Sequence, residues 1–249
     1  MDIDARSLHD AAISAQEAGD FTRALGLEFQ AMIAYQQSGD KKGFAEIQAM
    51  MFLTYRHLYE RSGDESYLML AKHAAMVGVE LAEKSSDTTA LAVPLLNLAR
   101  AQEMLGEYLE ASGSFDAALE EIETHPPTTH NKEAVKLDFA IHALTAKMRL
   151  GDLTLEQVVL DCINELKKAK GATDYERGVW LSGGYMRLAT VFKDRDEAKV
   201  HEYLSYAKEV IDADTNLELR RVQWEKLVRK LVGNTSITQK SKSANQHKS

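Results

Sequence analysis

The sequence contains little cysteine and proline, and both shortages narrow the range of possible folds. Its 249 residues include one cysteine, Cys162, so no disulfide can form within the chain, which fits a reducing compartment such as the cytoplasm. Proline occurs three times, twice as the adjacent pair Pro126 and Pro127. Long proline-free stretches rich in alanine, leucine, glutamate and lysine favour helices. Valine and isoleucine never alternate with polar residues over a run, so strands are not expected.

The sequence also has no long apolar run and little positive charge, which bears on membranes and nucleic acids as partners. The first residues lack the basic and apolar regions of a secretory signal, and no apolar run approaches membrane-spanning length. We therefore expect neither a signal nor a membrane span. Positive charge is also in deficit, since the formal net charge is −8. An acidic chain is repelled by nucleic acid and by anionic lipid, so neither is expected as a partner.

The sequence also lacks the short motifs of phosphate-binding loops, dinucleotide sites and zinc sites. His125 and His130 are too few for a metal site, and the acidic cluster Asp194 to Glu197 lacks the glycine and the further ligands of a calcium loop. Cys162 has apolar neighbours at helical spacing, which is typical of a small core residue rather than a reactive thiol. We expect no catalytic residues, no metal and no cofactor, and hence a protein that is not an enzyme.

What the sequence does contain is a regular internal repeat. The stretches "AGDFTRAL", "SGDESYLML", "LGEYLEAS" and "LGDLTLEQ" place Gly19, Gly63, Gly106 and Gly151 at intervals of 43 to 45 residues. A further 45 residues lead to Asp196, where a polar turn stands without the glycine. Glycine adopts the left-handed conformation that ends a helix, and an acidic residue favours the start of the next helix. Each unit therefore reads as a helix, a tight turn and a second helix.

The repeat predicts how the chain is divided. We expect one helical domain over residues 1–232, with units at about 4–38, 40–84, 87–124, 131–170 and 173–213. A capping helix follows at 215–232, with one apolar and one basic face, as the end of a stacked array requires. A helix that lies on a membrane or binds calmodulin is the alternative for this segment. Residues 233–249 have almost no apolar side chains and are expected to be disordered.

Small and aromatic residues in the third unit resemble the tetratricopeptide repeat. Leu98 and Ala99 fill the pair typical of its first helix, and Ala111 and Phe115 fill the Ala-x-x-x-Phe of its second helix. Tyr108 and Phe115 are expected to fill the space between neighbouring hairpins. The period exceeds the roughly 34 residues of that family, so the units look like lengthened, degenerate repeats. The resemblance implies an all-α fold, a right-handed α-solenoid of about five antiparallel helix hairpins plus a C-terminal capping helix.

The resemblance also implies a binding surface. In tetratricopeptide arrays the first helices of successive hairpins line a concave groove, and the family often uses an asparagine at the position of Asn97 to bind a peptide backbone. Each candidate groove residue could instead be an ordinary solvated side chain. The candidates are Arg6, His9, Ile13, Met50, Leu53, His57, Asn97, Arg100, His142, Arg149, Met186 and Arg187.

These features favour a non-enzymatic, cytoplasmic scaffold or adaptor that binds a protein or peptide in this groove. Acidic and basic residues balance along the expected groove, which suits an amphipathic or apolar segment rather than a strongly acidic tail. Flexible methionines would adapt to the shape of that segment. The alternative is a regulatory protein that senses a ligand or peptide, similar to bacterial tetratricopeptide-type regulators but without a DNA-binding domain.

Overall fold

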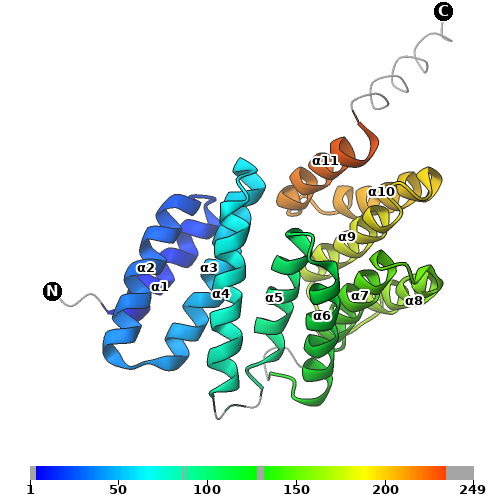
Figure 1. The fold of residues 1–249 in the computed structure, drawn as a ribbon. Helices are drawn as coiled ribbons and strands as arrows, with labels where there is room; N and C mark the ends of the chain where they lie inside the picture. Colours follow the sequence, from blue (N-terminus) through cyan, green and yellow to red (C-terminus); the bar gives the residue numbers. More distant parts are fainter. Residues whose placement is uncertain (1–3, 86, 88, 128–131, 234–249) are drawn as a thin grey trace, which may run out of the picture. The chain divides into compact units, whose positions relative to one another are not determined.

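The computed structural model describes residues 4–85, 87, 89–127 and 132–233, and every regular element within these ranges is a helix (Figure 1). The described ranges contain no strand, as the missing alternation of apolar residues predicts. The chain divides into two compact units, one up to residue 131 and one from Lys132 onward. The expected disordered tail, residues 233–249, lies outside the described residues except for Gly233.

The first unit consists of three helix hairpins. Its helices are α1 (Ala5–Glu17), α2 (Phe21–Ser38), α3 (Lys41–Ser62), α4 (Ser66–Glu83), α5 (Ala92–Met104) and α6 (Tyr108–Thr124). Each odd-numbered helix pairs with the helix that follows it, and successive hairpins also pack on one another.

The second unit consists of two hairpins and a last helix. It comprises α7 (Glu133–Arg149), the short 3₁₀ helix η1 (Leu153–Leu155), α8 (Glu156–Leu166), α9 (Asp174–Val191), α10 (Glu197–Asp212) and α11 (Glu218–Val232). The described residues thus form five hairpins and a C-terminal helix, which confirms the helical-repeat prediction.

The turns inside the hairpins follow the repeated glycines. Gly19, Gly63, Gly106 and Gly151 all have positive φ, between 73° and 120°, the region that glycine enters without steric cost. In the fifth hairpin the left-handed residue is Asp194, with φ 62°, so an aspartate replaces the glycine. The Asp196 carboxylate then caps α10 by accepting a hydrogen bond from the Lys199 amide. The fifth turn therefore also contains a left-handed residue, but Asp194 stands two residues before the capping residue of α10, whereas Gly19 directly precedes the capping residue of α2.

Alanines and a few large side chains form the core of the first unit. One cluster joins α1, α2 and α3 through Leu8, Ala12, Ala31, Tyr35, Ile47 and Met50. A second joins α3, α4 and α5 through Met51, Phe52, Tyr55, Ala71, Ala74, Ala75 and Ala101. Phe115 of α6 is buried as expected, but the expectation for Tyr108 is wrong, because this ring is 41% exposed. Tyr108 is the first residue of α6, where the helix leaves the turn.

A single larger cluster forms the core of the second unit and draws on α7 to α11. Gly184 of α9 lies where a side chain would press on Ile141 and Ile163, at 3.3–3.4 Å from its Cβ position, so glycine allows the three helices to pack closely. Cys162 is partly buried against this cluster, and burial raises the pKa of its thiol. This environment agrees with a packing role rather than a reactive one.

Candidate binding faces of the first helices

The described residues contain neither a cluster of metal ligands nor a membrane-spanning helix. No three histidine, cysteine, aspartate or glutamate side chains there converge as metal ligands. None of the described helices combines the length and the apolar character needed to cross a membrane. The remaining candidates are the surfaces formed by the first helices of successive hairpins. One such surface is described below for each unit.

In the first unit, α1 and α3 lie side by side and share what we call the α1–α3 face, made of Arg6, Asp10, Ile13, Glu46, Leu53 and His57. The Arg6 guanidinium joins the two helices, because its Nη1 lies 3.2 Å from Glu46 Oε2 while its Nε lies 3.1 Å from Asp10 Oδ1. These charges are therefore paired with one another. One arginine is shared between two carboxylates here, so this end of the face carries a net charge of about −1.

The middle of the α1–α3 face is apolar. Ile13 and Leu53 are both partly buried, each with its inner side packed on a core cluster and the rest open to solvent. Beyond them, the His57 ring stacks on Phe21 with centroids 4.9 Å apart, and its Nδ1 lies 3.3 Å from Glu60 Oε2. The result is an apolar strip flanked by fixed polar groups.

Four of the predicted groove residues lie mostly inside the repeats. His9, Met50, Asn97 and His142 are each exposed by less than a tenth. His9 Nδ1 is 3.0 Å from the Tyr35 hydroxyl, and burial lowers the pKa of this histidine. These positions border the packing surface of their helices, so they offer little area to a partner. Their role in peptide binding stays a prediction.

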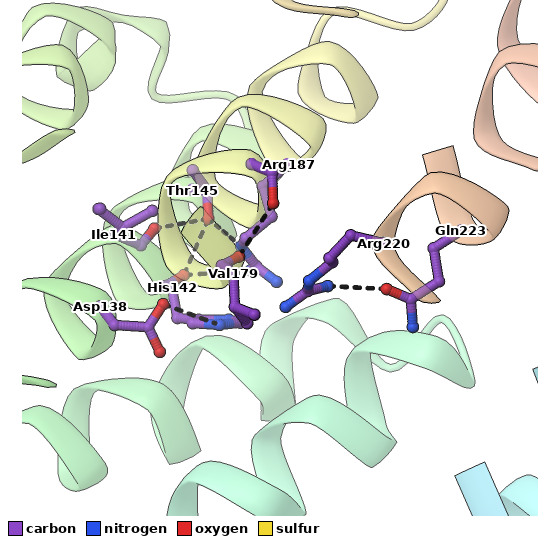
Figure 2. Close-up of polar contacts among 9 residues, drawn as sticks. Asp138, Ile141, His142, Thr145, Val179, Arg187, Arg220 and Gln223 are labelled. Atoms are coloured by element: carbon purple, nitrogen blue, oxygen red, sulfur yellow. Dashed lines mark hydrogen bonds and ion pairs between the residues drawn. The ribbon is translucent and has the colours of Figure 1, made fainter. Parts of the chain in front are cut away.

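In the second unit, α7 and α11 both pack on α9. The side chains of His142, Thr145, Arg187 and Arg220 form what we call the α7–α9–α11 face (Figure 2). Arg187 of α9 donates from Nε to Thr145 Oγ1 at 2.7 Å and from Nη2 to the His142 carbonyl at 3.3 Å, both on α7. The Thr145 hydroxyl in turn donates to the Ile141 carbonyl at 2.7 Å. Two helices of successive repeats are thus joined through one arginine.

The same face receives a second arginine from α11. Arg220 donates to Gln223 Oε1 at 2.9 Å, and its Nη2 lies 3.6 Å from the position of a Cβ on Gly183 of α9 (Figure 2). Glycine at this point leaves room for the guanidinium beside the helix backbone. Of the predicted residues, His142 and Arg187 meet on this face, and Met186 is partly buried against the unit's core. Arg220 was not among the predicted groove residues, because the segment 215–232 was expected to be a capping helix or, alternatively, a helix that lies on a membrane or binds calmodulin.

Arg100 and Arg149 are partly buried and lie toward the ends of α5 and α7. The Arg149 carbonyl accepts a hydrogen bond from Arg195 Nη2 at 3.0 Å, and the Met148 carbonyl accepts one from Arg195 Nη1 at 2.9 Å. Arg195 therefore satisfies the C-terminal carbonyls of α7. The predicted set is thus divided between the two units, each of which holds part of it on its own first helices.

Sequence reasoning also missed a buried acid behind the α1–α3 face. Glu28 of α2 is fully buried, and its Oε1 accepts a hydrogen bond from Thr54 Oγ1 at 2.5 Å. Thr54 accepts one from Gln16 Nε2 at 2.9 Å. Burial raises the pKa of Glu28 to about 7, against the weaker opposing effect of the Thr54 hydrogen bond. The sequence did contain a signal for this burial. Glu28 lies one helical turn from both Ala24 and Ala31, and therefore on the apolar side of α2.

The chain resembles known proteins in its fold. No family model matches the chain, and no curated protein matches it significantly in sequence. Solved structures do match, among them a Podospora anserina protein described as a putative kinesin light chain with nearly identical TPR-like repeats. The TM-score is 0.57 at 14% identity, over 86% of this chain and 100% of that one. Identity this low speaks for the fold alone. The repeated helix pairs and this similarity together give the chain a tetratricopeptide-like repeat fold.

Proposed function

We propose that the protein is a non-enzymatic scaffold or adaptor that binds a segment of another protein on the first-helix faces of its repeats. Helical-repeat folds present extended surfaces, and proteins commonly use them for interactions with other proteins. The partner segment would be amphipathic or apolar rather than strongly acidic.

The observation that carries this proposal is the apolar strip on the α1–α3 face. Ile13 and Leu53 are partly buried, and the exposed part of each lies between charged groups that pair with one another, as Arg6 does with Asp10 and Glu46. An apolar side chain of a partner would bury area against this strip without separating those pairs. Because the charges of this face sum to only about −1, binding of an apolar segment should depend weakly on salt.

The α7–α9–α11 face supports the same proposal with fixed polar groups. Arg187 is held by Thr145 and by the His142 carbonyl, so its guanidinium is in position before a partner arrives. Side chains that are already ordered lose less conformational entropy on binding. Backbone carbonyls or single carboxylates of a partner are the groups that such arginines recognise.

The test is a fluorescence-anisotropy titration of the full chain with two labelled peptides, an amphipathic helical one and an acidic C-terminal one, at low and high salt. We expect micromolar binding of the amphipathic peptide that changes little with salt, and none of the acidic peptide. The variant Leu53→Asn should weaken binding about tenfold, whereas Met76→Asn, at an exposed position of α4, should not. Thermal melts of both variants control for unfolding. Salt-sensitive micromolar binding of the acidic peptide would contradict the proposal.

A further inference from the structure

A chain of two hydrogen bonds runs from the α1–α3 face into the packing of α2. Gln16 Nε2 of α1 donates to Thr54 Oγ1 of α3 at 2.9 Å, and the Thr54 hydroxyl donates to Glu28 Oε1 of α2 at 2.5 Å. Gln16 is partly buried, whereas Thr54 and Glu28 are fully buried. Three helices of the first unit are therefore joined through side chains that lead to one carboxyl group.

The outer end of this hydrogen-bonded chain lies beside the apolar strip of Ile13 and Leu53. Gln16 stands three residues after Ile13, so the two side chains are neighbours on one side of α1. Thr54 directly follows Leu53 in α3. The hydrogen bond between Gln16 and Thr54 thus joins the two helices next to the strip. A partner segment that packs on the strip would also cover the Gln16 amide.

The inner end of the hydrogen-bonded chain is a carboxyl group that faces no opposite charge. Its Oε1 accepts from Thr54, and Glu28 Oε2 has no hydrogen-bond partner among the described residues. Among the described helices, α1 and α3 make the main contacts with α2. Tyr55 of α3 is close enough to sense Glu28, whose charge adds to the effect of burial in raising the Tyr55 pKa. A tyrosine hydroxyl is neutral near pH 7 and cannot compensate a carboxylate.

The other ionisable groups of α1 and α3 lie farther from Glu28. The His9 ring contacts Tyr35, and the His57 ring contacts Phe21. Phe21 and Tyr35 each stand seven residues from Glu28 along α2, which corresponds to about 10 Å. The charged residues of α1 and α3 are all at least partly exposed, and they are Arg6, Asp10, Glu17, Lys41, Lys42, Glu46, Arg56, Glu60 and Arg61.

We propose that Glu28 makes partner binding on the α1–α3 face dependent on pH, because the segment binds the form of the protein in which Glu28 is neutral and is released when Glu28 gives its proton to solvent. The inference rests on the proposed function, since it concerns the regulation of the same face. An ionised carboxyl group inside the hairpin needs water, and the hydrogen-bonded chain reaches solvent at Gln16, which the partner would cover.

The direction of the effect follows from this loss of hydration. A segment over Gln16 disfavours the ionised carboxyl group, so it raises the pKa of Glu28 above the value of about 7 in the free protein. The bound protein then keeps the proton at a pH where the free protein releases it. Affinity is therefore highest below about pH 7 and falls above it, by about tenfold at most if binding raises the pKa by one.

The experiment is an anisotropy titration of the full chain with a labelled amphipathic helical peptide, acetylated and free of histidine, between pH 6 and pH 8.5 at constant ionic strength. Circular dichroism at each pH confirms that the protein is folded. We expect the wild-type Kd to rise about five- to tenfold over this range, and that of Glu28→Gln to stay constant. His57→Gln removes the histidine of the face and leaves Glu28 in place. It should keep the wild-type ratio of Kd values, whatever its affinity at pH 6.

Calorimetry counts the protons directly. The same peptide is titrated at pH 7.5 in buffers that differ in their enthalpy of ionisation. Wild type and His57→Gln should take up a fraction of one proton for each peptide bound, and Glu28→Gln should take up none. Should Glu28→Gln not fold, uptake in both other proteins supports the inference, and no uptake in wild type overturns it.

The outcomes distinguish this inference from the proposed function. If the peptide binds at no pH, or if Leu53→Asn binds it as tightly as wild type at pH 6, the proposed function fails and this inference fails with it. If the peptide binds but wild type and Glu28→Gln show the same pH dependence, the inference alone is overturned. A pH dependence that disappears in His57→Gln would belong to that histidine and would also overturn the inference.

Discussion

Glu28 is a carboxyl group enclosed in the first hairpin, where its Oε2 has no hydrogen-bond partner among the described residues. A buried carboxylate with one partner favours the neutral form, which explains why the pKa of Glu28 rises to about 7. The same environment acts on Tyr55, whose pKa burial raises first and the nearby Glu28 raises further. The group that links α2 to α3 through Thr54 therefore changes charge near neutral pH.

The raised pKa predicts a stability that falls as the pH rises. The folded chain holds the Glu28 proton up to about pH 7, whereas the unfolded chain releases it near the ordinary value of 4.5. The contribution of this group is thus complete below about pH 4.5, declines between 4.5 and 7, and stays lost above 7. The variant Glu28→Gln cannot ionise. Its free energy of unfolding relative to wild type should rise by ~2–3 kcal/mol between pH 5 and pH 8.

Urea denaturation of both proteins at several pH values measures this difference and cancels the titration of all other groups. Gln16→Ala is a useful companion, because it removes the outer member of the hydrogen-bonded chain and leaves Glu28 in place. Its pH dependence should resemble that of wild type. A difference between wild type and Glu28→Gln that is constant across the range would show that Glu28 is ionised in the folded protein at all these values.

The loop that follows α8 is held in place by one side chain of α9. Arg177, in the first turns of α9, donates from Nη1 to the carbonyls of Leu166, Lys167 and Ala169 at 3.3, 3.1 and 2.8 Å. Its Nη2 donates to the Ala172 carbonyl at 3.2 Å. The last carbonyls of a helix have no partner within it, so this arginine supplies donors to the end of α8 and to the connection.

Replacing Arg177 by alanine should therefore free the connection between α8 and α9. We expect a loss of about 1–3 kcal/mol in the free energy of unfolding and faster amide exchange over residues 167–173. Arg177→Lys should restore only part of the loss, because one ammonium group cannot reach carbonyls that a planar guanidinium reaches together. Amide exchange followed by mass spectrometry gives the local readout. Unchanged exchange in Arg177→Ala would mean that packing alone holds the loop.

The prediction of elements from the sequence succeeded where one residue decides the geometry. The turn glycines Gly19, Gly63, Gly106 and Gly151 marked four of the five hairpins, since few residues other than glycine enter the left-handed region. The fifth turn was placed by its period, but its left-handed residue, Asp194, was not identified. Arg177 could not be found either, because its role depends on four carbonyls that come together only in the fold.

The candidate site was less predictable than the fold for a related reason. Helical periodicity predicts on which side of a helix a residue lies. How much of that side is exposed to solvent depends on the neighbouring helices, which periodicity does not give. His9, Met50 and Asn97 fall on the packed side of that border, while Ile13 and Leu53 fall across it. Arg187 was predicted as a groove residue, yet its bonds to α7 follow from repeat stacking and not from spacing.

The second unit contains a hydrophobic core of its own. One cluster draws buried side chains from all five of its α-helices, including Ile141 of α7, Ile163 of α8, Leu188 of α9, Ala207 of α10 and Val228 of α11. Trp224 Nε1 of α11 donates to the Leu204 carbonyl of α10 at 2.9 Å, which secures the last helix to the hairpin before it. The unit comprises roughly 100 residues, a size at which single domains commonly fold alone.

We therefore expect residues 132–233 to fold as an independent fragment. Repeat arrays gain stability from the hairpins themselves and from contacts between adjacent hairpins, so a fragment that keeps two hairpins and α11 retains most of its stabilising contacts. Its circular dichroism should be helical, and its thermal unfolding should be cooperative. The same fragment with Ile163→Ala, a fully buried position, should lose about 2–5 kcal/mol and serves as the internal control. A fragment that is helical but binds a hydrophobic dye and melts without cooperativity would show that its core needs the first unit.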